Sequence, residues 1–320
     1  MNKESKELKH IMLLVLGSII WGAAFVAQSV GAEHVGPLTF LSIRSWLGAL
    51  SLVPVIIIMR RRRALSGPDD GGASGQVRQP GEVANGTQGE AVNNGASFLG
   101  GLAEPVKGGL VCGTFLFAAS LLQQAGIAYT TTAKAGFITA LYVVFVPVLS
   151  FLIGLKSTWK TWVCMVMGVA GLYLLCMTGS SSFGRGDLLM LACAFTFSLQ
   201  IMSVNHFVKR ADGLLLAEFE FFFEAVLATF FMLIFEKVTY TGIIAAAPAL
   251  LYTGLLSSGV GYTLQIIGQE GVNPSLASLV MSLESVFSAI SGWLILGQSM
   301  SVREILGCLV MFAAIVLSQL

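Results

Sequence analysis

A single acidic residue interrupts an apolar stretch near the C-terminal end of the chain. The stretch is ASLVMSLESVFSAISGWLILG, residues 277–297, and Glu284 lies near its middle. A charged side chain at the centre of a bilayer costs about 2.5–3.5 kcal/mol on insertion scales, so such a residue faces a cavity or a partner. Two interpretations of Glu284 stay open: a group that binds a proton or a substrate amine, and a structural acid hydrogen-bonded between helices.

Two further ionisable residues inside apolar stretches are candidates for function. Arg44 belongs to the stretch 38–59, and Glu224 lies near the middle of the stretch 214–235. A guanidinium can hold a substrate carboxylate through two parallel hydrogen bonds, or it can pair with an acid on another helix. A pair between Arg44 and Glu284 is one hypothesis, and Glu224 is a second candidate for proton coupling.

Uncharged polar side chains in other apolar stretches predict a polar pathway. They are Trp21 and the amides Gln28, Gln123, Gln200, Asn205 and Gln265. Each amide alone is equally compatible with a hydrogen bond between helices. The candidates for substrate binding or proton coupling are Glu284, Arg44, Glu224, Trp21, Gln123 and Gln265.

The composition indicates an integral membrane protein. Of the 320 residues, 55% are hydrophobic and 11% are charged, whereas soluble domains carry about 25% charged residues. Apolar stretches long enough to cross a hydrocarbon core of roughly 30 Å recur along the chain. We predict an all-α fold with ten transmembrane helices near residues 10–30, 38–59, 108–128, 135–154, 161–178, 187–207, 214–235, 245–267, 275–296 and 302–319.

Residues 60–107 do not fit the apolar pattern. This segment is rich in Gly, Ser, Asn and charge, which is typical of a flexible linker. If the N-terminus is cytoplasmic, this linker and most of the 18 Lys and Arg residues fall on the cytoplasmic side. The positive-inside rule therefore places both termini in the cytoplasm.

The chain repeats itself after 142 residues. Residues 122–153 align with residues 264–295 through identities that include Leu122/Leu264, Gln123/Gln265, Gly126/Gly268, Leu141/Leu283 and Phe145/Phe287. A repeat unit of five helices is odd in number, so the second copy must enter the membrane upside down. We predict two inverted repeats, 1–178 and 179–320, an arrangement common in secondary transporters.

Small residues follow one face of two predicted helices that correspond in the repeat. Ser278, Ser282 and Ser285 lie in 275–296, and Gly136 and Ala140 lie in 135–154. Spacings of three and four keep such residues on one side of a helix. The pattern fits either close helix packing or the wall of a cavity.

Four motifs carry a family resemblance: WGAAF (21–25), LSIRSW (41–46), GDLLML (186–191) and LESVFSAISGWLILGQ (283–298). Through them the chain resembles the drug/metabolite transporter superfamily, specifically its ten-helix EamA-type permeases. The last motif is similar to the family pattern EPV…G…lgE, except that Ser285 replaces the proline and Gln298 replaces the final acid. The resemblance implies transport of a metabolite or drug, usually export, without ATP hydrolysis, in the cytoplasmic membrane of a bacterial-type cell.

We therefore expect a multi-pass transporter that works by alternating access on a small polar or amphipathic solute, such as an amino acid or a drug-like compound. The expected partners are the solute, the lipid bilayer and protons, with a homodimer left open and no nucleic acid or cofactor. A nucleotide-sugar or phosphorylated-sugar exchanger is the first alternative, although only Arg44 and Lys134 could meet a phosphate. A membrane enzyme is a distant alternative, since the sequence has no metal-ligand cluster and no paired nucleophile and base.

Overall fold

The computed structural model describes residues 3–65, 89–130, 132–155, 158–176, 184–296 and 301–319, and these residues form helices and no strands. The first half contains α1 (Lys3–Ala32), α2 (Pro37–Leu65), α3 (Gly89–Ile127), α4 (Thr132–Thr139), α5 (Tyr142–Leu152) and α6 (Trp159–Cys176). The second half contains α7 (Arg185–Phe207), α8 (Gly213–Phe235), α9 (Tyr240–Leu251), the π-helix η1 (Tyr252–Tyr262), α10 (Thr263–Glu270), α11 (Pro274–Met281), α12 (Glu284–Leu296) and α13 (Val302–Gln319).

Many of these helices are long and apolar enough to cross a membrane. Within the described residues, seven stretches meet this condition: Glu7–Ala32, Pro37–Ile58, Leu102–Ile127, Ala135–Leu152, Arg185–Phe207, Tyr240–Glu270 and Pro274–Ile295. Two shorter apolar helices, Trp159–Leu174 and Ile305–Ser318, accompany them. Helix α8 is as long as a span but carries three glutamates. The expectation of an all-helical membrane protein is confirmed.

Two of the predicted spans are broken near their centres. The expectation of one continuous helix over 135–154 is wrong, because α4 ends at Thr139 and α5 begins at Tyr142; likewise α11 ends at Met281 and α12 begins at Glu284. At each break the backbone N–H groups bond to carbonyls three residues back, as Leu141 N does to Ile138 O and Leu283 N to Val280 O. Bonds of this kind tighten the backbone into a 3₁₀-type turn.

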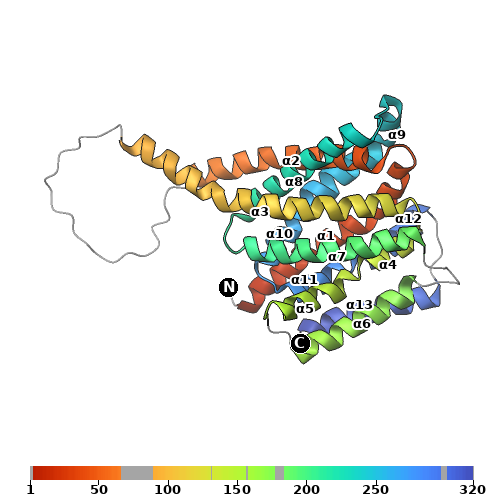
Figure 1. Ribbon diagram of the computed structural model, residues 1–320. Helices are drawn as coiled ribbons and strands as arrows, with labels where there is room; N and C mark the ends of the chain where they lie inside the picture. The colour runs from red at the N-terminus through yellow and green to blue at the C-terminus, as the bar shows by residue number, and fades with distance from the viewer. Residues whose placement is uncertain are drawn as a thin grey trace.

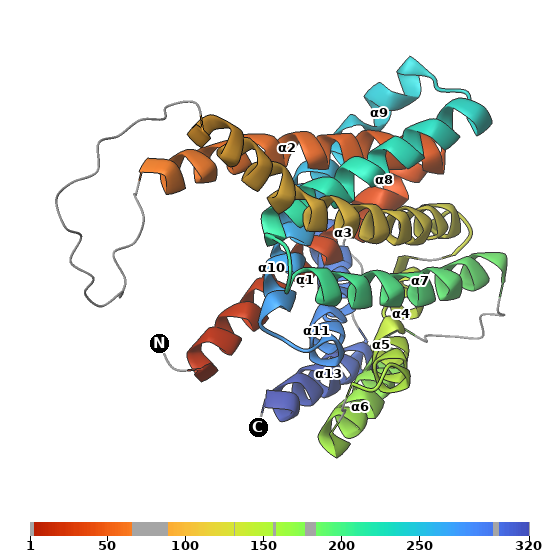
Figure 2. The ribbon, with the colours of Figure 1, turned by 60° about the vertical axis from the view of Figure 1, so that its left-hand side comes forward.

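The broken helices pack against each other in the middle of the bundle. Helix α4 contacts α12, and α5 contacts α11. Ser285 Oγ donates a hydrogen bond to the Gly136 carbonyl oxygen at 3.0 Å. The small-residue faces of the sequence therefore allow close packing at this point. Around this centre α2 packs on α8, α3 packs on α7 and α8, and α6 packs on α13, as Figures 1 and 2 show from two directions.

The ends of the predicted linker 60–107 are helical. Helix α2 continues to Leu65 and α3 begins at Gly89, and both project beyond the bundle in Figure 1. Once a helix is nucleated, each added residue gains one hydrogen bond, so a spanning helix extends readily into a polar flank. Residues 66–88, like Gln298, lie outside the described residues.

Helices α3 and α8 approach closely at the glycines of α3. A Cβ atom added at Gly113 would lie 2.5 Å from the Glu220 carbonyl oxygen, and one added at Gly109 would lie 2.3 Å from the Phe219 Cβ. By contrast, a Cβ at Gly136 on α4 would meet its nearest atom, Ser285 Oγ, at 3.8 Å. Small residues on α3 thus fix the distance between α3 and the acidic helix α8.

Gly113→Ala is expected to lower the free energy of unfolding by about 1–3 kcal/mol, because the added methyl group overpacks a backbone contact. Gly136→Ala is the matched control and should leave stability unchanged or raise it, since alanine favours a helix by about 1 kcal/mol over glycine. Thermal unfolding in mild detergent compares the two variants. Equal unfolding temperatures for both variants would contradict the close contact between α3 and α8.

Candidate functional site

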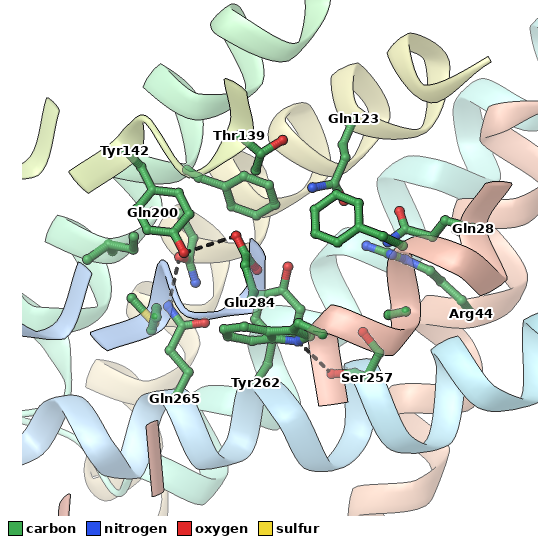
Figure 3. A pocket seen from close by; sticks show the side chains of 16 residues that line it. Gln28, Arg44, Gln123, Thr139, Tyr142, Gln200, Ser257, Tyr262, Gln265 and Glu284 are labelled. Atoms are coloured by element: carbon green, nitrogen blue, oxygen red, sulfur yellow. Dashed lines mark hydrogen bonds between the residues drawn. The ribbon is translucent and has the colours of Figure 1, made fainter. Parts of the chain in front are cut away.

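A pocket lies where the broken helices meet (Figure 3). Its lining residues come from both halves of the chain: α1 to α5 in the first, and α7, η1, α10, α11 and α12 in the second. Helices α6, α8, α9 and α13 do not line it.

Glu284 lines this pocket and is held by a tyrosine from the other half of the chain. The side chain of Tyr142 donates a hydrogen bond to Glu284 Oε1 at 3.0 Å. Glu284 is 6% exposed and Tyr142 is 4% exposed. Each is the first residue of a helix that begins after a break, and the N-terminus of α12 favours a carboxylate through the helix dipole.

Tyr142 was not among the residues expected from the sequence. The signal was present in the repeat, because a shift of 142 residues places Tyr142 on Glu284. The repeat is recognised from identical residues, and Tyr142 and Glu284 are not identical or similar. The position matters because both helix breaks deliver their first helical side chain to the same pocket.

Arg44 lines the pocket but pairs with a different acid from the one proposed. Its Nη2 lies 3.8 Å from Glu224 Oε1 and donates a hydrogen bond to Ser120 Oγ at 2.8 Å. The hypothesis of an Arg44–Glu284 pair is wrong, because α2 packs along α8, which carries Glu224, whereas α12 packs on α1 and α4. Arg44 thus contacts an acid on another helix, Glu224 on α8.

The Arg44–Glu224 pair is buried: the side chains are 3% and 0% exposed. Glu224 does not itself line the pocket, so it contributes through Arg44. A buried guanidinium needs a nearby negative charge to offset its desolvation. The pair keeps a charged donor at the pocket wall.

The remaining candidates lie in the pocket wall. Trp21 Nε1 donates to the Ser257 carbonyl oxygen at 3.3 Å, and the Trp21 ring packs edge-on against Tyr262 at 4.9 Å. Gln123 and Gln265, which are equivalent in the repeat, both line the pocket. Of the other amides, Gln28 and Gln200 also line it, whereas Asn205 does not.

The two charged groups that line the pocket, Glu284 and Arg44, lie apart from each other (Figure 3). Figure 3 shows Tyr142, Gln200 and Gln265 on one side of Glu284, and Gln28 and Arg44 on the other. Aromatic and aliphatic side chains, including Trp21, Phe25 and Phe197, complete the wall. An apolar wall with a few separated polar groups is typical of a site for a small amphipathic molecule.

A second hollow, larger than the central pocket, lies on the side of the bundle where the described chain begins and ends. We call it the vestibule; its wall includes Glu7, Ser150, Lys160, Lys209, Ser275 and Ser318. Val143 and Leu279 line the vestibule, whereas Tyr142 and Met281 line the central pocket. A thin layer at the two helix breaks therefore separates the two spaces.

Comparisons with known proteins agree with this architecture. The chain is 24% identical over 316 residues to a protein of Archaeoglobus fulgidus described as an uncharacterized transporter, covering 98% of this chain and 87% of that protein. A solved crystal structure matches 97% of the chain with a TM-score of 0.68 at 17% identity, covering 96% of that protein, which shows the fold. The sequence model of the EamA-like transporter family matches residues 8–72, 95–177 and 184–320, and the chain therefore belongs to this family.

Proposed function

We propose that the chain is a secondary-active exporter of a small polar or amphipathic metabolite, such as an amino acid or a drug-like compound, working by alternating access. The observation that carries this proposal is the central pocket, with Glu284 and Arg44 in one mainly apolar wall. Glu284 would bind a proton or a cationic group of the solute, and Arg44 would hold an anionic group.

The two halves of the chain, 1–178 and 179–320, are proposed to be inverted repeats of five spanning helices each. Several observations support this. The helix breaks lie 142 residues apart and use equivalent backbone hydrogen bonds, such as Val143 N to Ala140 O and Ser285 N to Ser282 O. Helices that correspond in the repeat also pack on each other, as α2 does on α8 and α6 on α13. Carriers built this way bind solute at the repeat interface.

The vestibule supports a route for solute entry from the cytoplasm. It lies on the side of the two chain ends, which the positive-inside rule predicts to be cytoplasmic. A solute would enter there and pass the layer formed by Val143 and Leu279 to reach Glu284. Export then requires the opposite face of the pocket to open.

Ser275→Cys tests this orientation. In a Cys164→Ala background, since Cys164 lines the same vestibule, the new thiol should react with a membrane-impermeant reagent added to inside-out vesicles and not to intact cells. The matched control is Tyr240→Cys, whose native residue is 78% exposed at the start of α9 on the expected outer side; it should show the reverse pattern. Labelling of Ser275→Cys from outside alone would invert the proposed topology.

The exchanger of nucleotide sugars or phosphorylated sugars gains no support from the pocket. Arg44 is the one cation among the residues that line it. A phosphate ester with two negative charges would need further donors of positive charge.

Efflux from cells that overproduce the protein tests the proposed function. The cells are loaded in turn with labelled amino acids, nucleosides and cationic drugs, and solute loss is compared with cells that carry Glu284→Gln at equal membrane abundance. Faster loss of one solute with wild type alone supports the carrier and its central acid. Unchanged efflux of the whole panel would contradict an exporter of these solute classes.

A further inference from the structure

Glu220 is a buried carboxyl group that the proposed transport site does not use. It lies on α8 outside the pocket and is 0% exposed. Its Oε1 accepts a hydrogen bond from Gln200 Nε2 at 2.8 Å, whereas its Oε2 has no hydrogen-bond partner. Across the part of the chain that the structure describes, no Lys, Arg or His lies within salt-bridge distance of it. Burial without a cation disfavours the ionised form, so this group is suited to binding a proton.

The surroundings of Glu220 contain four other titratable or charged groups. The helices packed on α8 contribute Cys112 from α3 and Arg44 from α2, while Tyr262 approaches from η1. Glu224, one turn further along α8, is the fourth, and it is the partner of Arg44. From α7 and α10 the neighbouring groups are the amides of Gln200 and Gln265. The cation near this cluster is therefore already paired, and Glu220 is left with an amide.

Two hydrogen-bonded glutamine side chains, Gln200 and Gln265, connect Glu220 to the pocket. Gln200 donates through its Nε2 to Glu220, and its Oε1 accepts from Gln265 Nε2 at 3.2 Å. Both glutamines line the pocket, beside Tyr142 and Glu284 in Figure 3. With its Nε2 engaged by Gln200, Gln265 retains its carbonyl oxygen for the pocket.

The direction of the hydrogen bonds that join Glu220, Gln200 and Gln265 depends on the charge of Glu220. An ionised carboxylate only accepts hydrogen bonds, so it holds the NH₂ group of Gln200 toward itself, whereas a protonated carboxyl group donates one. A glutamine amide exchanges its oxygen and nitrogen by a half-turn about its last torsion. A proton on the Glu220 oxygen that faces Gln200 would therefore turn Gln200, and the NH₂ of Gln200 would in turn meet the oxygen of Gln265.

We propose that Glu220 is a positioning residue that sets, through Gln200, whether Gln265 offers the pocket a hydrogen-bond acceptor or a donor. The inference rests on the proposed function in one respect, that the pocket is the solute site. With Glu220 ionised, Gln265 presents its oxygen and favours a solute ammonium or hydroxyl group. With Glu220 protonated, Gln265 presents its NH₂ group and favours a carbonyl or carboxylate group. The same pocket would then hold a solute differently on the two sides of a membrane with a pH gradient.

Infrared difference spectroscopy of the full chain in lipid nanodiscs, without solute, tests the switch. Glutamine side-chain carbonyls carry a carbon-13 label, and spectra are recorded from mildly acidic to mildly alkaline buffer. We expect a carboxylic acid band that is lost in Glu220→Gln, and a shift of the labelled glutamine band with the same midpoint. In Gln200→Met the acid band of Glu220 should remain and the coupled glutamine shift should be lost.

Glu218→Gln is the matched control, two residues earlier on α8 and outside the amide chain, and it should keep the coupled shift. Gln265→Met interrupts the other hydrogen bond: the Gln200 part of the shift should remain and the Gln265 part should be lost, and this variant replaces Gln200→Met if that one fails to fold. The switch would be overturned by the absence of an acid band assignable to Glu220 or by a glutamine band that does not follow the titration of Glu220. A coupled shift that is retained in Gln200→Met, or undiminished in Gln265→Met, would overturn it as well. Since no solute is present, loss of transport with an intact coupled shift would count against the proposed function alone.

Discussion

Replacing Arg44 by methionine is expected to lower the free energy of unfolding by about 3–5 kcal/mol, because it leaves the Glu224 carboxylate buried without its cation. The Arg44–Glu224 contact is 3.8 Å long and both side chains are almost completely buried. Chemical or thermal unfolding of purified protein in mild detergent measures the effect. This is the largest stability change expected from a single substitution in the site.

The double variant Arg44→Met/Glu224→Met shows whether the two side chains stabilise the fold as a pair or independently of each other. Replacing both partners of a buried ion pair by apolar side chains is often neutral or stabilising, so the double variant should be more stable than Arg44→Met alone. Lys160→Met, on an exposed lysine of the vestibule, is the control and should change stability by less than about 0.5 kcal/mol. Strict additivity of the two single effects would rule out the pair.

Removing the Tyr142 hydroxyl group is expected to reduce transport about tenfold or more at equal membrane abundance. The Tyr142→Phe variant loses the 3.0 Å hydrogen bond to Glu284 and keeps the ring. Hydrogen bonds to charged groups contribute about 1.5–3 kcal/mol, and 1.4 kcal/mol corresponds to a factor of ten. Initial efflux rates of the solute identified in the cell assay measure the loss, which should be smaller than that of Glu284→Gln.

Tyr252→Phe provides a matched comparison for Tyr142→Phe. The Tyr252 hydroxyl group donates to the Ile20 carbonyl oxygen at 2.9 Å, away from the pocket lining. This variant removes the same atom and one hydrogen bond between helices, yet leaves Glu284 untouched, so transport should stay near wild type. Equal losses in the two variants would indicate that both hydroxyl groups act through stability.

Much of this architecture can be predicted from the sequence because few backbone conformations are stable inside a bilayer. Backbone polar groups inside lipid must be satisfied within the segment, so long apolar stretches predict helices reliably. The same constraint makes an acid such as Glu284 or a cation such as Arg44 conspicuous, and both lie in the pocket wall. The repeat also predicted that Gln123 and Gln265 would occupy comparable places, and both line the pocket.

The details that the sequence did not predict depend on tertiary packing. No proline or glycine marks the breaks at Ala140–Leu141 and Ser282–Leu283, so a pattern of hydrophobicity runs through them unchanged. The partner of Arg44 depends on which helix packs against α2, and hydropathy carries no information on helix neighbours. Tyr142 was not predicted as a site residue because a tyrosine in an apolar stretch is equally compatible with a packing role.

Solute counterflow in proteoliposomes tests the central claim, that the pocket around Glu284 is the solute site of a carrier. Purified protein is reconstituted with unlabelled solute from the cell assay inside the vesicles, and a trace of labelled solute is added outside without ATP. We predict a transient accumulation of label with wild type that is absent with Glu284→Gln. Accumulation that is equal with Glu284→Gln, or absent with wild type, would contradict the account.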